Sequence, residues 1–342
     1  MAKYRVGVIA LKMGAPWARA AASNPLTELT MVYDKNYDRN DKIDKKFFES
    51  SGCEILKKED DIYKAGLDVI IVASPDHFHA EQSIKALSSG SHTICEKPLA
   101  PTVAECKKII AAVKKSGKRF MTGQVCRYAP GFVLAKKLVD EGRIGEMAFI
   151  ESEYAHDYAK APGFDNWRND PKIKREGFIG GGCHAMDLLR WFAGSPLEVS
   201  CYMNRKLLAE NKWPTDDTGV AICKFPNEVI GKVFVSVGIK RSYTMRTVIS
   251  GTRGTIICDN TSPSIQIFEE KFIEQTGSAF STLPVNINNH NVAAELDDFV
   301  KCLHEKRPVL TDVYEGTRTV AFGEAAIKSA KSGKAVKVEV IK

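Results

Sequence analysis

The sequence lacks long apolar runs, and no stretch of its 342 residues approaches the length of a membrane span. Its first residues, MAKYRVGVIA, have neither the apolar core nor the cleavage site of a signal peptide. Internal repeats and low-complexity segments are also missing. We therefore expect a cytoplasmic protein without membrane partners, and a chain of this length can hold two domains with cores of their own.

Paired cysteines are missing as well. The nine cysteines are scattered, odd in number and never spaced C-x-x-C, which argues against a disulfide framework and against a zinc site. His77, His156 and His184 show no close ligand spacing either. We therefore expect free or buried thiols and no metal.

The chain also lacks a block of charge of one sign. Its net charge of +7 suits anionic ligands such as dinucleotides. The lysines are interleaved with acidic residues, however, as in KKEDD and DRNDKIDKKF, which is typical of a solvated helix surface. The pattern therefore disfavours nucleic acid as a partner.

The first third alternates short apolar runs with amphipathic segments. Strands are predicted at 4–10, 28–34, 69–73, 92–95 and 119–124, with helices at 16–23, 38–50, 78–89 and 102–116 between them. The run DVIIVA is apolar almost throughout, as a strand buried on both faces must be. This alternation predicts an α/β domain of the Rossmann type, a doubly wound parallel sheet, over residues 1–123.

Residues 124–342 show a different pattern. After one helix, PGFVLAKKLVDEG, come alternating β-branched stretches such as VAICKF and IGKVFVSVGI, then two more helices and a final strand. The pattern predicts an α+β domain with a large, mostly antiparallel sheet. A broad sheet with an uncovered face often becomes an interface, so we expect a homodimer or homotetramer through this sheet.

The stretch VGVIALKMGAPWARA resembles the start of a dinucleotide-binding fold without its glycines. The three positions of the fingerprint G-x-G-x-x-G carry Ala10, Lys12 and Ala15. In one interpretation, Gly14 reshapes the turn, Pro16 is the first helical residue and Lys12 adds a cation to the pyrophosphate site; Ala10 then costs little if its φ is negative. In the other, tight dinucleotide binding has been lost.

An ordered set of motifs runs along the chain. The segment ASPDHFHAEQSIKALSSGSHTICEKPLA is followed by GQVCRYAPG, NWRNDP, GGGCHAMDLLRWFAG, DDTGVAICKF and ISGTRGTI. Together they resemble the glucose–fructose oxidoreductase, inositol dehydrogenase and MocA family over essentially the whole chain. The resemblance implies a Rossmann domain that holds NAD and a sheet domain that presents a sugar, cyclitol or related polyol to the nicotinamide.

The resemblance also implies two catalytic residues. Lys97, directly after a predicted parallel strand, would relay the hydroxyl proton, and His184 would assist it. Many relatives carry an aspartate four residues before this histidine, where this chain has Gly180. Either Lys97 and His184 share the proton transfer, or another carboxylate, Asp187 or Asp165, substitutes.

Further site residues are expected from these motifs, from the turn after the first strand and from aromatic and polar residues that could line a sugar pocket. Asp34 ends the second strand, where a carboxylate accepts from the ribose hydroxyls and repels a 2′-phosphate, so NAD is favoured over NADP. Trp167 and Arg168 match a pair that lies near cofactor and substrate, and Arg168 could also bind a substrate carboxylate or phosphate. Predicted cofactor-binding residues are Lys12, Met13, Gly14, Asp34, Ser74, Pro75, His79, Glu96, Gln124 and Arg168. Predicted substrate residues are Tyr128, Tyr154, His156, Asp165, Trp167 and Asp187.

Three functions remain open at this point. The first is an NAD-dependent dehydrogenase acting on a secondary hydroxyl of a sugar, glycoside or cyclitol. The second keeps NAD bound and uses transient oxidation for elimination, epimerisation or glycoside cleavage. The third is a non-catalytic sugar sensor on the same fold. The retained Lys97 and His184 favour an enzyme over the sensor.

Overall fold

The computed structural model describes residues 3–286 and 290–342, and the chain divides into two compact units. The first unit comprises residues 1–124 and 291–317, and the second comprises 125–290 and 318–342. The sequence predicts a single boundary between 123 and 124. The structure differs in that residues 291–317 return to the first unit.

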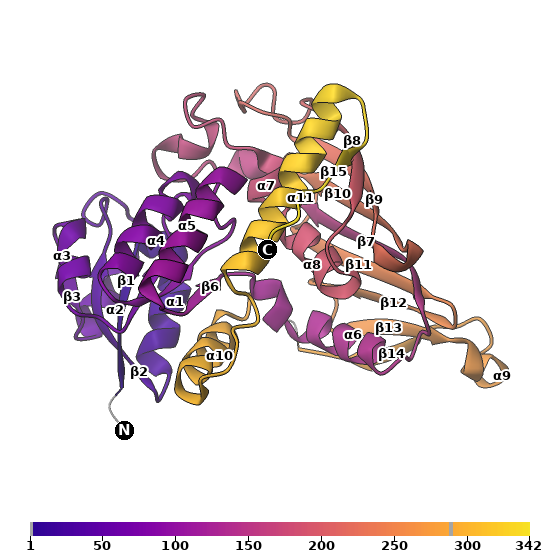
Figure 1. Ribbon diagram of the computed structural model, residues 1–342, viewed down its shortest axis with the longest axis horizontal. Coiled ribbons are helices and arrows are strands. Elements are labelled where there is room, and N and C mark those ends of the chain that lie inside the picture. The colour runs from indigo at the N-terminus through magenta and orange to yellow at the C-terminus, as the bar shows by residue number, and fades with distance from the viewer. Residues whose placement is uncertain (1–2, 287–289) are drawn as a thin grey trace. The chain divides into compact units, whose positions relative to one another are not determined.

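The first unit is built on a six-stranded parallel sheet with the strand order β3-β2-β1-β4-β5-β6. All four residues of β4 are buried, as expected for a central strand covered on both faces. The strands are β1 (Tyr4–Ile9), β2 (Thr27–Tyr33), β3 (Glu54–Leu56), β4 (Val69–Val72), β5 (His92–Cys95) and β6 (Phe120–Thr122) (Figure 1). This topology confirms the predicted doubly wound class.

Helices connect these strands, and local sequence sets their ends. Thr102 caps α5 by accepting from the backbone amide of Glu105 at 3.2 Å, and Gly117 ends it in the left-handed conformation. The helix predicted over 38–50 begins only at Lys45, because Asp44 accepts from the amide of Phe47 and caps it there. The helices of this unit are α1 (Leu11–Ser23), α2 (Lys45–Ser50), α3 (Glu59–Lys64), the 3₁₀ turn η1 (Asp76–Phe78), α4 (His79–Ser88), α5 (Val103–Ser116) and α10 (Val292–Glu305).

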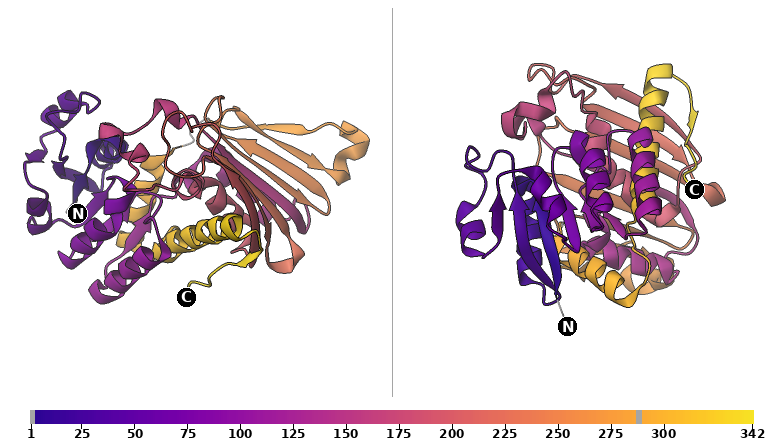
Figure 2. Two further views of the ribbon diagram at one scale, coloured as in Figure 1. Left: turned by 90° about the horizontal axis from the view of Figure 1, so that it is seen from above. Right: turned by 60° about the vertical axis from the view of Figure 1, so that its left-hand side comes forward.

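The second unit contains a nine-stranded sheet in the order β14-β13-β12-β11-β7-β10-β9-β8-β15. The pair β7–β10 is parallel, and the other pairs are antiparallel. Figure 2 shows its strands side by side. This confirms the predicted mostly antiparallel sheet. The strands are β7 (Met147–Ala155), β8 (Glu198–Asn204), β9 (Thr218–Lys224), β10 (Ile230–Ser236), β11 (Thr244–Gly251), β12 (Gly254–Asp259), β13 (Ser264–Glu269), β14 (Ser281–Pro284) and β15 (Val336–Lys337).

Helix α8 (Cys183–Ala193) packs on β7, β10 and β11. Gly182 allows this close approach, because a Cβ there would lie 2.5 Å from Cγ2 of Val235 on β10. The unit also contains η2 (Val125–Tyr128), α6 (Pro130–Asp140), η3 (Tyr158–Lys160), η4 (Phe164–Asn169), α7 (Gly177–Gly180), η5 (Pro226–Glu228), η6 (Glu270–Phe272) and α9 (Ile273–Thr276). Helix α11 (Val313–Ser332) runs across the division at 317.

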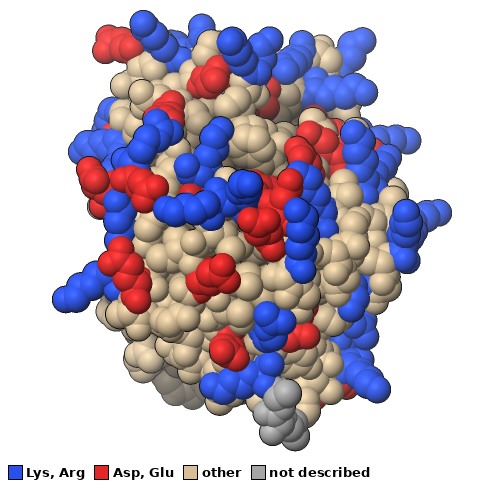
Figure 3. Space-filling model, turned by 90° about the vertical axis from the view of Figure 1, so that its left-hand side faces the viewer, with Lys and Arg blue, Asp and Glu red and all other residues tan. Residues whose placement is uncertain are grey.

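Charged side chains of both signs share the surface. On the face in Figure 3, lysine and arginine side chains are interspersed with aspartate and glutamate. Across residues 3–286 and 290–342, no helix is both long and apolar enough to cross a bilayer. Over the same residues, histidine, cysteine and acidic side chains nowhere gather in a group of three that could hold a metal ion.

Candidate active site

The turn after β1 replaces the glycine fingerprint in an unexpected way. Ala10 has a φ of 68°, so the condition of a negative φ is not met, and α1 begins directly after it at Leu11. Pro16 lies inside the helix and not at its first position. Asp34 stabilises this early start, because its Oδ2 accepts from the Leu11 amide at 2.7 Å.

Gly14 allows the close contact between α1 and β1 that the last glycine of the fingerprint would allow. A Cβ at this position would lie 2.7 Å from Cγ1 of Val8 on β1 and 3.4 Å from Cβ of Ala73. The helix therefore lies against the sheet at Gly14, one residue before the position predicted from the spacing. Ala15 is only half-buried.

The helix start nevertheless suits a dinucleotide. Lys12 and Met13 are exposed in the first turn of α1, and this turn contains no acidic residue that would repel a phosphate. Asp34, the residue after β2, lies at the same turn; its Oδ1 accepts from the Asn36 amide at 2.7 Å. These residues fit NAD, and a lysine stands where the fingerprint would have bare glycine backbone.

Glu96 fixes the Glu-Lys-Pro turn that follows β5. Its Oε1 accepts from Nε1 of the buried Trp17 on α1 at 2.8 Å, and its Oε2 accepts from the Lys97 amide at 3.1 Å. Both carboxylate oxygens are therefore engaged within the first unit. The backbone of Lys97 is held at the carboxyl end of β5, where open α/β sheets place their ligands.

His79 holds the Pro98 side of this turn through its ring nitrogens. The side chain is fully buried, and its Nδ1 and Nε2 each lie 2.8 Å from a carbonyl oxygen, of Pro98 and Ser74 respectively. Two acceptors favour an imidazolium that donates to both. Burial opposes the charge, but Cys95, Asp76 and the Pro98 carbonyl outweigh burial and raise the pKa of His79 to about 10.

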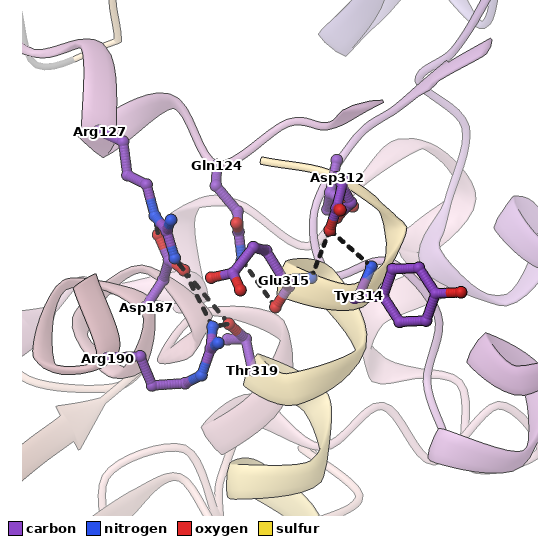
Figure 4. A network of polar contacts seen from close by, with 9 residues as sticks. Gln124, Arg127, Asp187, Arg190, Asp312, Tyr314, Glu315 and Thr319 are labelled. Carbon is purple, nitrogen blue, oxygen red and sulfur yellow. Dashed lines mark hydrogen bonds and ion pairs between the residues drawn. The ribbon is translucent and has the colours of Figure 1, made fainter. Parts of the chain in front are cut away.

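Other predicted cofactor residues lie around the same end of the sheet. Ser74 donates to Oε1 of Gln82 at 2.5 Å, and Pro75 immediately precedes η1. Gln124 is buried and its Nε2 donates to the Glu315 carbonyl at 3.4 Å (Figure 4). The structure therefore gives Gln124 a contact within the first unit that the sequence did not predict.

In the second unit, His184 lies in the first turn of α8 and is 3% exposed. Its Nδ1 lies 3.3 Å from Sγ of Cys126, and its ring stacks on Tyr154 with a centroid distance of 5.9 Å. The glycines before α8 bring this helix start against β10, as described above. His184 is thus held on a rigid element, as a proton-transfer residue requires.

A cluster of aromatic rings surrounds His184. Tyr154 and Tyr158 share a hydrogen bond of 2.9 Å between their hydroxyls, and the Tyr154 hydroxyl lies 3.3 Å from Nδ1 of His156. Burial, followed by the neighbouring Tyr158, raises the pKa of Tyr154 well above its usual value, so its hydroxyl stays protonated and can donate. The cluster combines ring faces with polar tips, which suits a polyol.

Asp187 lies on the same helix but is 2% exposed and bound to arginines (Figure 4). Its carboxylate accepts from Nε and Nη2 of Arg127 at 2.9 and 2.7 Å. Arg190 donates to Thr319 at 2.9 Å and lies 3.5 Å from the same carboxylate. This network favours a structural role for Asp187 over the predicted substrate contact, and over its use as a substitute base.

The remaining predicted residues fall in the loops of the second unit. Trp167 and Arg168 lie in η4, whose Asp165 is exposed and has a φ of 53°. Arg168 donates from Nη1 to the Ala161 carbonyl at 2.7 Å. Tyr128 is half-buried at the end of η2.

Sequence reasoning missed several residues of the aromatic cluster. Tyr243 and His290 share a hydrogen bond of 3.1 Å, and the His290 ring lies 5.7 Å from that of His184. Cys126 was missed as well, although it belongs to the quoted motif GQVCRYAPG. No spacing in the sequence signals that these residues meet His184, because they come from separate segments.

Two family models match the chain. "Oxidoreductase family, NAD-binding Rossmann fold" matches residues 4–124, and "GFO/IDH/MocA C-terminal domain" matches residues 132–257. These two stretches correspond to the core of the first unit and to most of the large sheet of the second.

Individual relatives agree with the family models. Levoglucosan dehydrogenase of Pseudarthrobacter phenanthrenivorans is 30% identical over 214 residues, which span 56% of this chain and 55% of that protein. scyllo-Inositol 2-dehydrogenase (NAD(+)) of Bacillus subtilis is 25% identical over 80% of this chain and 79% of its own length.

A solved structure of a levoglucosan dehydrogenase, in complex with NADH and levoglucosan, superposes with a TM-score of 0.84. It covers 98% of this chain and 99% of its own, at 23% identity, and so supports the fold. With both domain models matched in order, the chain belongs to the Gfo/Idh/MocA family of NAD-binding oxidoreductases.

Proposed function

We propose that the protein oxidises a secondary hydroxyl group of a sugar, glycoside or cyclitol, or reduces the corresponding ketone, with Lys97 and His184 handling the proton. The Glu-Lys-Pro turn carries this proposal. Glu96 holds the Lys97 amide and His79 holds the Pro98 carbonyl, so the backbone that carries a basic side chain is fixed at the end of β5, where open parallel sheets commonly bind ligands. The relatives named above are a levoglucosan dehydrogenase and a scyllo-inositol 2-dehydrogenase.

The proton leaves the substrate hydroxyl as the carbon is oxidised. Bound NAD⁺ supplies the two-electron oxidation. Lys97 is the proposed acceptor of this proton. His184, which Cys126 and Tyr154 contact, is the second residue to which the family resemblance gives a part in the proton transfer. The named relatives are dehydrogenases, so neither the elimination nor the sensor alternative gains support from them.

Lys12 and Asp34 are the proposed contacts of the dinucleotide. Lys12 is exposed in the first turn of α1, where a helix N-terminus would attract the pyrophosphate. Asp34 accepts two backbone amides, and each of its oxygens retains a lone pair for a ribose hydroxyl. A 2′-phosphate beside this carboxylate would be repelled, which favours NAD.

Calorimetric titration with NAD⁺, NADH, NADP⁺ and NADPH, followed by absorbance assays of NADH formation over a polyol panel, tests the proposal. We expect saturable binding of NAD(H) and oxidation of at least one polyol. Lys97→Met should retain NADH binding and lose about 10²- to 10⁴-fold in kcat. Lys115→Met, which changes an exposed lysine of α5, is the matched control. Full activity of Lys97→Met would contradict the assignment.

A further inference from the structure

Two sulfur atoms lie next to His184 in the interior of the second unit. Sγ of Cys126, in η2, lies 3.3 Å from Nδ1 of His184 and 3.3 Å from Sδ of Met245 on β11. Cys126 is 1% exposed, Met245 is fully buried and His184 is 3% exposed. Three separate segments of the chain therefore bring a thiol, a thioether and an imidazole into contact away from the surface.

The contact between the two sulfur atoms determines where the thiol proton lies. A thioether carries no proton, so Met245 can only accept, and Cys126 is the donor of this hydrogen bond. The thiol has one proton. Its contact with His184 is therefore a hydrogen bond only if Nδ1 donates and the sulfur accepts. The opposite arrangement, with the thiol donating to Nδ1, would leave two sulfur atoms 3.3 Å apart with no proton between them.

A proton on Nδ1 fixes the tautomer of a neutral His184 ring. Nε2 is then the nitrogen that carries the lone pair. This tautomer can accept the proton of a substrate hydroxyl and so share the proton transfer with Lys97. When the ring accepts a proton it becomes an imidazolium, and Nδ1 keeps the same hydrogen bond to the sulfur. Both protonation states therefore fit the same arrangement of side chains.

Aromatic contacts hold the ring and the thioether in place. The His184 ring stacks on Tyr154 and on His290, with centroid distances of 5.9 and 5.7 Å. The Tyr243 hydroxyl lies 3.3 Å from Sδ of Met245. Burial is the largest of the effects that raise the pKa of Tyr243 well above its usual value, so this hydroxyl stays protonated and can donate to the sulfur.

We propose that Cys126, supported by Met245, is a positioning residue that holds His184 in its proton-accepting tautomer. Many relatives carry an aspartate where this chain has Gly180, and Asp187 is bound to arginine side chains. A thiol from another segment therefore orients the ring here. The catalytic task of this tautomer rests on the proposed dehydrogenase function, whereas the tautomer itself is a property of the protein without substrate.

The tautomer is measured by ¹H–¹⁵N NMR on the whole protein labelled with ¹⁵N-histidine, at about pH 8.5, above the ordinary pKa of histidine. Loss of signals in His184→Gln identifies this ring. We expect its proton on Nδ1 in the unmodified protein. Met245→Leu removes the sulfur acceptor at nearly the same volume and should move the proton to Nε2, because the thiol can then donate to Nδ1. A proton on Nε2 in the unmodified protein, or an unchanged tautomer in Met245→Leu, would overturn the proposal.

Turnover of polyols tests the effect on catalysis. Cys126→Ala and Met245→Leu should each lower kcat by about 10- to 100-fold, as loss of a partner that orients a histidine does, and leave KM for the polyol and Kd for NADH within about twofold. Cys126→Ser restores one donor and one acceptor and should recover part of the loss. A fall in NADH binding as large as the fall in kcat would show a merely structural role and overturn the proposal.

Controls and readouts separate this inference from the function on which it rests. Cys258→Ala and Met186→Leu, which change a buried cysteine of β12 and a buried methionine of α8, should leave kcat and the tautomer unchanged. A proton on Nε2 of His184 in an active dehydrogenase would overturn the inference alone. Absence of NADH binding by the unmodified protein would overturn the dehydrogenase function, and with it the catalytic task of the tautomer.

Discussion

His92 and His79 are two histidines of the first unit whose ring nitrogens are held in opposite ways. Nδ1 of His92 accepts from the Arg119 amide at 2.9 Å, which requires a neutral nitrogen. The ring of His79 lies between two carbonyl oxygens, which favour the cation. The hydrogen-bond partners of each ring therefore agree with its charge.

His92 makes the stability of the first unit dependent on pH. Burial, followed by the nearby Lys118, lowers the pKa of His92 to about 4 from an unfolded value near 6.5. Below the unfolded value the unfolded chain binds a proton that the folded chain does not, so this contribution to stability falls as the pH falls from about 6.5 to 4. Thermal melts at several pH values should show a smaller acid-induced loss in His92→Gln than in the unmodified protein. Identical pH dependence would contradict the assignment.

At the scale of elements, two residues outside the expected glycine positions determine where α1 begins and how it packs. Asp34 caps the helix from the end of β2, and Gly14 brings the helix against β1. Trp17 joins the same helix to Glu96 beyond β5. One helix thus connects the proposed pyrophosphate site with the turn that carries Lys97.

Substitution of Gly14 tests the contact between α1 and β1. Gly14→Ala places a methyl group 2.7 Å from Cγ1 of Val8, so we expect a loss of about 1–3 kcal/mol in the free energy of unfolding and weaker NAD⁺ binding. The double variant with Val8→Ala should recover part of both losses, because it removes the atom that the new methyl group meets. Urea unfolding and calorimetry of both variants measure this coupling. Strictly additive effects would show that the contact does not control the helix position.

Local patterns predicted the elements well and the long-range neighbours poorly. The strand–helix alternation led to the Rossmann class, since periodicity is a local property. The role of Lys97 came from the resemblance of the Glu-Lys-Pro motif to a known family. The early start of α1 was missed because Asp34 stabilises it from 23 residues away.

At the scale of the whole molecule, the large sheet leaves apolar side chains uncovered. Tyr202 of β8 is 83% exposed and lies directly opposite Val220 of β9. Ile222 and Ile230 are also about half exposed. In an isolated chain this face would remain in contact with water. The exposed apolar side chains therefore favour the predicted homo-oligomer through the sheet.

Light scattering coupled to size-exclusion chromatography tests that prediction. We expect the unmodified protein to elute as a dimer or tetramer and Ile222→Lys to shift towards monomer, because a charge would be buried in an apolar interface. Lys224→Met, on the same strand, is a control that should not dissociate the assembly. A monomeric unmodified protein, or an unchanged assembly in Ile222→Lys, would exclude this face as the interface.

The return of residues 291–317 to the first unit also determines when that unit can be completed. Helix α10 packs on α1, Asn24 donates to Asp297 at 3.1 Å, and the Thr122 amide donates to the Thr311 carbonyl at 2.7 Å. After the ribosome has made Gln124, about 190 further residues must follow before these partners exist, which takes roughly 10–40 s at common elongation rates. During synthesis the surface of α1 that α10 covers therefore stays exposed to solvent. The first unit, although its first strand begins the chain, is among the last parts of the protein to be completed.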